Sequence, residues 1–246
     1  NAHAIALIGR AGFPEFNIDL IYGLPGQTLT TWCHSLDQAI DSPATSLFLY
    51  PLYVRPLTGL GRRTQLDSPT AHTMGRMYDA ALDRLTRAGF RQITMRQFRR
   101  DPESVEKDDG YRCQRDGMVG LGAGARSYTR HLHYSTPWKM ITRNIRNVIE
   151  NYIRSDHTQI THGIWLDDDE RHRRRVIQGL LYDGLEASEA VGFPEEFTAL
   201  AEEGLIRTVA DRITLTPRGV RHADIVGNLF FSPRVRTLIE EYEYDT

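Results

Sequence analysis

The sequence predicts an α/β fold followed by a smaller domain of helices and a hairpin. Three observations support this. An apolar run at 16–22 ends in Gly-Leu-Pro-Gly, and residues 29–40 then show helical periodicity, which indicates a strand, a turn and a helix. The alternation of strand and helix continues to residue 98. From about residue 164 onward, helical segments precede a short hairpin, a pattern typical of a separate α+β domain.

Composition and charge exclude several classes of protein. The hydrophobic content of 40% and charged content of 25% are ordinary for a soluble globular chain. A formal net charge of -2 provides no basic field toward nucleic acid or an anionic membrane. Cys33 and Cys113 are too far apart for a Cys-x-x-Cys metal pattern or a disulfide framework. No apolar run has the length of a membrane span, so we expect a cytoplasmic protein without a membrane partner.

The first part of the chain is predicted to alternate helices and strands. Helices are expected at 2–11, 29–40 and 70–88, and strands at 16–22, 46–54 and 91–98. Thr28 is the expected N-cap of the second helix, and Gly89 should end the third. Regular pairing of the second strand should stop near Pro51, which cannot donate to a ladder. The first strand is predicted to be a buried parallel strand, so the carboxylate of Asp19 within it requires a partner.

The second part is predicted to be more helical. The expected elements are a glycine-rich run at 113–128, a helix at 137–155, a linker at 156–163, helices at 171–181 and 194–203, a hairpin at 205–216 and a final helix from Pro217. The linker suggests two domains, 1–156 and 164–246. His131 and His133 would share one face of a strand, but no carboxylate or cysteine at matching spacing completes a metal site. Cys113 is interpreted as a small buried hydrophobe.

Two stretches resemble a known family. Residues 17–28, Asn-Ile-Asp-Leu-Ile-Tyr-Gly-Leu-Pro-Gly-Gln-Thr, resemble the signature of radical S-adenosylmethionine (SAM) enzymes of the oxygen-independent coproporphyrinogen III oxidase family, of the HemN and HemW types. Residues 120–125, Gly-Leu-Gly-Ala-Gly-Ala, resemble the family stretch that lines the adenine side of SAM. The sequence of residues 114–135 is similar to that of a HemN-like subgroup without an assigned substrate. The resemblance implies the C-terminal portion of a partial (β/α) radical SAM barrel, followed by a winged-helix-like domain.

The resemblance also implies a function for the full-length protein. A 4Fe-4S cluster would cleave SAM reductively to a 5′-deoxyadenosyl radical, which then abstracts hydrogen from a porphyrin-like or other small-molecule substrate. An electron donor such as flavodoxin or ferredoxin would be the partner. Oxidative decarboxylation of the coproporphyrinogen dehydrogenase kind and radical methyl transfer both stay open. The cluster cysteines, Cys-x-x-x-Cys-x-x-Cys, are expected upstream of Asn1, so the chain alone is expected to be inactive and contains no metal ligands.

Site residues follow from the matched positions. The residues that the resemblance places against SAM are Asp19, Gly23, Pro25, Val119, Leu121 and Ala123. The candidate substrate or anion contacts are Tyr50, Tyr53 and Arg55, since an Arg- and Gly-rich loop at the carboxyl end of a strand suits a carboxylate or phosphate. HemW-type sequences tend to have an acidic residue where Arg55 stands, and this departure weakens the case for a porphyrin-like substrate.

Two alternatives come from other functional classes. The first is a haem-binding or haem-delivery protein, because HemW-type proteins are thought to have this role. The second is nucleic-acid binding through the winged-helix-like domain, which has a basic cluster at 171–175. The acidic residues at 167–170 offset that cluster, and the net charge does not suit a protein that tracks phosphates. We therefore expect no nucleic-acid partner.

Overall fold

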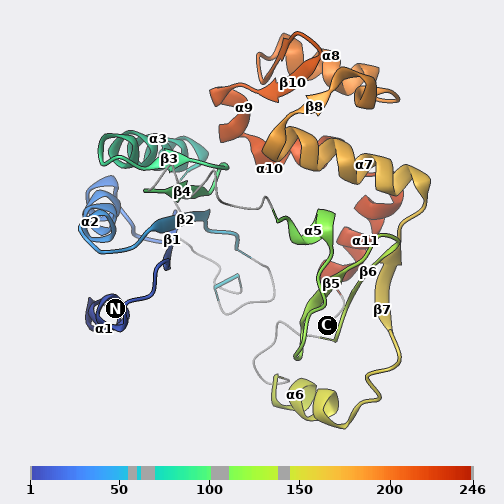
Figure 1. Ribbon diagram of the computed structural model, residues 1–246, viewed down its shortest axis with the longest axis horizontal. Coiled ribbons are helices and arrows are strands. Elements are labelled where there is room, and N and C mark those ends of the chain that lie inside the picture. Colours follow the sequence, from blue (N-terminus) through green and yellow to red (C-terminus); the bar gives the residue numbers. More distant parts are fainter. Residues whose placement is uncertain (1, 55–59, 62–69, 101–110, 138–144, 245–246) are drawn as a thin grey trace. The chain divides into compact units, whose positions relative to one another are not determined.

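The computed structural model describes residues 2–54, 60–61, 70–100, 111–137 and 145–244 (Figure 1). The chain divides into two compact units, 1–109 and 110–246, and each is described by itself. The sequence-based boundary at 156–164 differs from this division, because residues 110–163 group with the C-terminal part. No helix of the described residues is long and apolar enough to cross a membrane.

The first unit contains the predicted alternation of helices and strands. Its elements are α1 (Ala2–Ala11), β1 (Asn17–Tyr22), α2 (Leu29–Ile40), β2 (Ser46–Pro51), α3 (Ala71–Arg87), β3 (Arg91–Gln92) and β4 (Gln97–Arg99). The four-stranded sheet has the order β1-β2-β4-β3, with β1 parallel to β2 and the other pairs antiparallel. Helices α2 and α3 lie on one face of this sheet (Figure 1).

The core of the first unit lies between that face and the two helices. Its fully buried side chains include Trp32 and Leu36 from α2, Met77 from α3, and Leu47 and Phe98 from the sheet. Nε1 of Trp32 donates to the carbonyl oxygen of Met77 at 2.8 Å, so the one polar atom of the largest core side chain is satisfied.

Local signals fixed the ends of α2 and α3. Thr28 accepts a hydrogen bond from the N–H of Thr31 at 3.2 Å and donates its own N–H to Oγ1 of Thr31 at 3.0 Å, which confirms the predicted cap. Strand β2 ends at Pro51, as expected of a residue without an N–H. Gly89 follows α3 with φ +83°, a left-handed conformation that favours glycine.

The single strand expected at 91–98 is wrong, because the segment turns back on itself as β3 and β4. Oγ1 of Thr94 accepts the N–H groups of Arg96 and Gln97 at 3.3 and 3.1 Å, and the N–H of Ile93 donates to the carbonyl of Gln97 at 2.8 Å. A threonine hydroxyl that bonds nearby N–H groups in this way closes a tight turn, which periodicity does not reveal.

The expectation of a buried β1 is also wrong. Ile18, Leu20 and Tyr22 face the core, but Asn17, Asp19 and Ile21 are exposed on the other face of the sheet. Within the described residues β1 pairs only with β2, so it is an edge strand. Asp19 therefore does not need the buried partner that the sequence argument required.

In its described residues, the second unit contains two three-stranded sheets. Its elements are α5 (Cys113–Asp116), β5 (Arg126–Tyr128), β6 (Leu132–Ser135), α6 (Ile145–Arg154), β7 (His162–Trp165), α7 (Asp168–Gln178), a π-helical turn η2 (Gly179–Asp183), β8 (Leu185–Glu186), a 3₁₀ turn η3 (Ala187–Ala190), α8 (Pro194–Glu202), β9 (Ile206–Val209), β10 (Arg212–Leu215), α9 (Pro217–Arg221), α10 (Ala223–Leu229) and α11 (Pro233–Tyr244). The sheets have the orders β5-β6-β7 and β8-β10-β9.

Three sequence expectations need correction here. The linker expected at 156–163 overlaps β7, whose residues pair with β6 from Leu132↔Trp165 to Ser135↔His162. The helix expected at 137–155 is described only as α6, with Pro137 outside it and 138–144 outside the described residues. The final helix expected from Pro217 is three helices, α9 to α11.

The predicted hairpin is confirmed as β9 and β10, which are joined through Ala210 with φ 52°. Its apolar residues pack with α7, α8 and α10 around a second core. Members of this core are Val176, Leu180, Leu185, Phe193, Leu200, Ile206, Ile213, Val226 and Phe230. This arrangement of helices and a hairpin gives the C-terminal part a hydrophobic core of its own.

Candidate functional site

The carboxyl end of β1 turns sharply at Gly23. Gly23 has φ +85°, and a Cβ there would lie 2.9 Å from Cε of Met74, so both conformation and space favour glycine. Its N–H donates to Oε1 of Gln27 at 2.7 Å, and the N–H of Gln27 donates to the carbonyl of Leu24 at 2.9 Å. Pro25 lies inside this bonded turn. The side chain of Gln27 therefore holds the Gly-Leu-Pro-Gly turn in one shape.

Asp19 lies on the face of the sheet opposite to α2 and α3. Its Oδ1 accepts a hydrogen bond from Nδ2 of Asn17, whose Oδ1 in turn accepts from Oγ of Ser46 at 3.1 Å. The carboxylate is thus oriented by a short polar chain from β2 and still exposed. An oriented, exposed carboxylate can accept hydrogen bonds from hydroxyl or ammonium groups of a ligand.

Tyr50 and Tyr53, two predicted contact residues, both lie close to the guanidinium group of Arg96. The guanidinium carbon of Arg96 is 5.6 Å from the ring centroid of Tyr50 and 5.8 Å from that of Tyr53, and its Nη2 donates to Oη of Tyr53 at 3.2 Å. Burial and the carboxylate of Asp19 raise the pKa of Tyr50, against the opposing charge of Arg96. Arg96 is not among the candidate contacts that the sequence indicated, and Arg55 lies outside the described residues.

The glycine-rich loop of the second unit, residues 118–128, is closed at its base by backbone hydrogen bonds. Met118 and Tyr128 exchange backbone hydrogen bonds of 2.9 and 2.8 Å at its base. A Cβ on Gly120 would lie 2.3 Å from the carbonyl oxygen of Arg126, so only glycine fits there. The N–H of Gly120 donates to Oγ of the buried Ser127 at 3.0 Å. The first half of the loop is therefore tied tightly to β5.

Along this loop, residues whose backbone N–H is hydrogen-bonded alternate with residues whose backbone groups are not. The N–H groups of Met118, Gly120 and Gly122 all donate to partners inside the unit. Among the described residues, the backbone groups of Val119, Leu121 and Ala123 have no hydrogen-bond partner. The side chains of Val119 and Leu121 are 70% and 87% exposed. These three residues are the ones that the sequence comparison placed against adenine, and their N–H and C=O groups are available to a ligand.

The two histidines singled out from the sequence belong to the packing of α7. Arg171 Nη1 lies 3.0 Å from Nδ1 of His131, and Arg174 Nη1 lies 2.9 Å from Nε2 of His133. His131 precedes β6, so the two do not share a strand as expected. Within the described residues, no three His, Cys, Asp or Glu side chains gather as metal ligands.

The predicted SAM residues therefore fall into two groups. Asp19, Gly23 and Pro25 lie in the first unit, whereas Val119, Leu121 and Ala123 lie in the second. The structure describes each group within its own unit. Sequence reasoning assigned no role to Ser127, although it stands inside the glycine-rich run at 113–128, and nothing near the loop in sequence pointed to the distant residue Tyr152.

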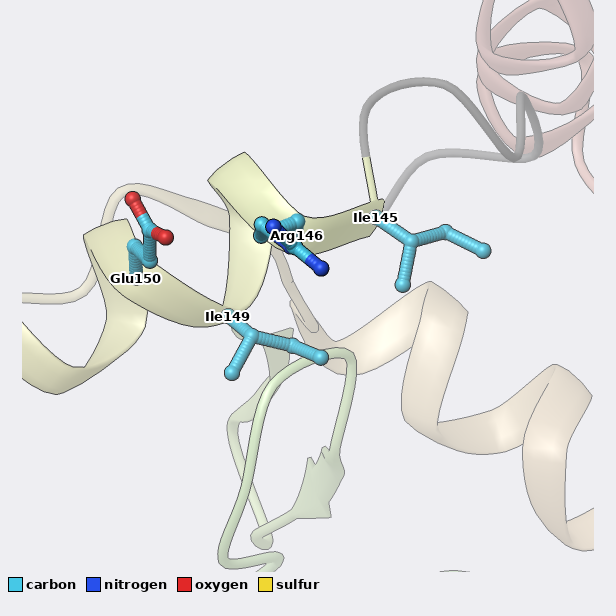
Figure 2. A pocket seen from close by; sticks show the side chains of 4 residues that line it. All are labelled: Ile145, Arg146, Ile149 and Glu150. Carbon is cyan, nitrogen blue, oxygen red and sulfur yellow. The ribbon is translucent and has the colours of Figure 1, made fainter.

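A hollow of about 550 Å³ lies beside α6 and is lined, among the described residues, by Ile145, Arg146, Ile149 and Glu150. Figure 2 shows the two isoleucine side chains on one side of the helix, with Glu150 pointing away from them. This lining offers no aligned backbone groups and no cluster of titratable side chains. The glycine-rich loop and the open sheet face are therefore the better candidates for chemistry.

The fold is similar to that of a solved protein whose description names it a radical SAM enzyme. The structure matches a solved structure described as "Coproporphyrinogen III oxidase (HemN) from Escherichia coli is a Radical SAM enzyme", with a TM-score of 0.73 and 24% identity over 93% of this chain and 58% of that one. No model of a known protein family matches the sequence.

The chain is similar in sequence to curated HemN and HemW proteins, over their C-terminal part. It is 26% identical to an oxygen-independent coproporphyrinogen III oxidase of Pseudomonas aeruginosa, over 84% of this chain and 49% of that protein. It is 28% identical to the haem chaperone HemW of Mycobacterium tuberculosis, over 93% of this chain and 56% of that protein. The chain thus spans about half the length of these relatives.

Proposed function

We propose that this chain forms the SAM-binding surfaces of a HemN/HemW-like radical SAM enzyme. In this proposal Asp19, Gly23 and Pro25 contact SAM from the first unit, and 119–123 contact its adenine through main-chain atoms. The observation that carries the proposal is the row of unpaired backbone groups at Val119, Leu121 and Ala123, which alternate with the paired N–H groups of Met118, Gly120 and Gly122. Adenine presents both donors and acceptors on one edge, which suits such a row.

The cluster is proposed to be held by residues outside 1–246. Two cysteines eighty residues apart cannot supply the closely spaced thiolates that a 4Fe-4S cluster takes. Bound together, the cluster and SAM would supply reductive cleavage and a radical that starts chemistry on a small-molecule substrate. This chain would orient SAM and line part of the substrate space, and a flavodoxin or ferredoxin would deliver electrons.

The open face of the first sheet supports a substrate with both an aromatic and an anionic part. Phe48 and Tyr50 stack at 6.1 Å between ring centroids, and Arg96 lies over Tyr50. Such a surface offers a flat apolar area next to a cation, which is how proteins hold planar carboxylates. A porphyrin-like molecule meets this description, and so do smaller aromatic acids.

Haem delivery is the second candidate function. The identity to HemW relatives, 26% and 28%, equals or exceeds the 26% identity to the oxidase of Pseudomonas aeruginosa, so similarity does not separate the two classes. Nucleic-acid binding is disfavoured, because Arg171 and Arg173 pair with Asp168 and Asp169, and Arg174 bonds to His133. We retain a winged-helix-like fold for 164–246 as a proposal without a nucleic-acid role.

A pair of titrations of the full-length protein separates these functions. Equilibrium dialysis with radiolabelled SAM should give saturable binding at one site per chain, and titration with haem should give no new Soret band at micromolar protein. A Soret band on addition of haem, without retention of SAM, would favour haem delivery over the radical SAM function. Retention of both ligands would favour a HemW-like protein that also uses SAM.

A further inference from the structure

We propose that Tyr152 and Thr136 are positioning residues that fix Gly122, and with it the outward backbone groups of Leu121 and Ala123. The inference rests on the proposed SAM function and names two side chains that set the shape of that site. Neither residue lies in the glycine-rich loop itself, since Thr136 follows β6 and Tyr152 lies on α6.

Both backbone polar groups of Gly122 bond to side chains outside the loop. Its N–H donates to Oη of Tyr152 at 2.9 Å, and its carbonyl oxygen accepts from Oγ1 of Thr136 at 2.8 Å. The same carbonyl accepts the N–H of Ala125 at 3.1 Å, which closes the turn from 122 to 125. Gly122 is therefore connected to two other elements of the unit as well as to its own turn.

Hydrogen bonds, rather than packing, hold Gly122 in place. A Cβ on Gly122 would meet no atom within 4 Å, whereas one on Gly120 would lie 2.3 Å from the carbonyl oxygen of Arg126. Gly122 has φ +118°, a conformation from which glycine can rotate to many others at little cost. Loss of its side-chain partners would leave Gly122 with its turn bond alone.

A rotation at Gly122 would turn the peptide groups on both sides of it. Those peptide groups contain the C=O of Leu121 and the N–H of Ala123, both of which are unpaired within the described part of the chain. Tyr152 is itself held, because its half-buried ring lies against His157 with 4.7 Å between ring centroids. The phenol oxygen of Tyr152 thus connects α6 to Gly122, and through Gly122 to the backbone groups of Leu121 and Ala123.

The test replaces only the hydroxyl groups. Tyr152→Phe and Thr136→Val remove the bonds to Gly122, and Thr136→Ser keeps a hydroxyl at the same position. Tyr134→Phe is the matched control, because Tyr134 lies on β6 and its hydroxyl has no hydrogen bond within the described residues. Amide hydrogen exchange of the ¹⁵N-glycine-labelled, cluster-free full-length protein gives one readout, and the SAM dissociation constant of the reconstituted protein gives the other.

Tyr152→Phe should speed exchange of the Gly122 N–H by about tenfold and raise the SAM dissociation constant by about five- to tenfold, as expected for one lost hydrogen bond. Exchange of the Gly120 N–H, which donates to Oγ of Ser127, should not change. Thr136→Val should also weaken SAM binding, and Thr136→Ser should restore most of it. Unchanged exchange at Gly122, or faster exchange with unchanged SAM affinity, would overturn the inference. Absence of SAM binding by the wild-type protein would instead overturn the proposed function.

Discussion

Nη1 of Arg174 on α7 lies 2.9 Å from Nε2 of His133 on β6. The same guanidinium donates to the carbonyl oxygens of Thr129 at 3.1 Å and Arg130 at 3.3 Å. Because arginine remains charged and can only donate, Nε2 must be the acceptor and the ring of His133 must be neutral. This contact joins the sheet β5-β6-β7 to α7 within the compact unit 110–246.

The contact between Arg174 and His133 makes the stability of the second unit sensitive to acid. Burial, followed by the charge of Arg174, lowers the pKa of His133 from 6.5 to about 4. The unfolded chain therefore binds more protons than the folded one between these values, so the free energy of unfolding falls as the pH drops from 6.5 toward 4. The full difference corresponds to at most roughly 3 kcal/mol, and solvent screening of the half-buried ring reduces it to about 1–2 kcal/mol.

Urea denaturation at pH 7 and pH 4.5 measures this effect. His133→Asn should remove most of the pH dependence, although it also loses stability at pH 7. His162→Asn, a change of an exposed histidine on β7, is the control and should keep the wild-type dependence. An equal pH dependence in His133→Asn and the wild type would mean that other groups cause the acid sensitivity.

Gly120→Ala should destabilise the second unit. The added Cβ would lie 2.3 Å from the backbone oxygen of Arg126, so the strand or the loop must shift. Overpacking of this kind costs about 1–3 kcal/mol. Thermal unfolding followed by near-ultraviolet circular dichroism measures the loss, and Ala123→Ser on the exposed side of the same loop is the control. A variant as stable as the wild type would mean that the loop has room to move.

Asp19→Asn should weaken binding of SAM without changing stability. Asp19 is exposed and pairs with Asn17, so the amide replaces the carboxylate at little structural cost. Loss of one charge-assisted hydrogen bond to the ligand corresponds to about 1–3 kcal/mol in binding free energy. Calorimetric titration of SAM into the reconstituted full-length protein measures it. Equal affinity in both proteins would leave Asp19 with the role of orienting Asn17 and nothing more.

Residues 1–246 expressed alone should self-associate through the first unit. Strand β1 is an edge strand within the described residues, and Ile21 on it is 46% exposed. Leu7 and Phe13 beside it in sequence are 47% and 63% exposed. An open strand edge next to apolar side chains is a template for association. Size-exclusion chromatography with limited proteolysis should give oligomers in which 1–60 is cleaved before 165–230. A monomer with equal protection of both regions would contradict this expectation.

Local signals allowed the sequence to predict some elements and not others. Helix α2 was placed at its observed bounds because its cap at Thr28 lies next to it in the chain. Strand β7 was missed because it is a short, partly polar segment. Only its pairing with β6 makes it a strand. The same limit applied to the site. Val119, Leu121 and Ala123 were named from the family resemblance, whereas the bond from Gly122 to Tyr152 spans thirty residues and has no local signature.

Reductive cleavage of SAM is the most direct test of whether this chain binds SAM as part of a radical SAM enzyme. The full-length protein would be reconstituted anaerobically with iron and sulfide, reduced with dithionite and incubated with SAM, and the products separated by liquid chromatography. We predict formation of 5′-deoxyadenosine and methionine, with the rate reduced in Asp19→Asn and in Tyr152→Phe. Intact SAM after reduction, in a protein whose cluster is shown by its absorbance to be present, would contradict the account.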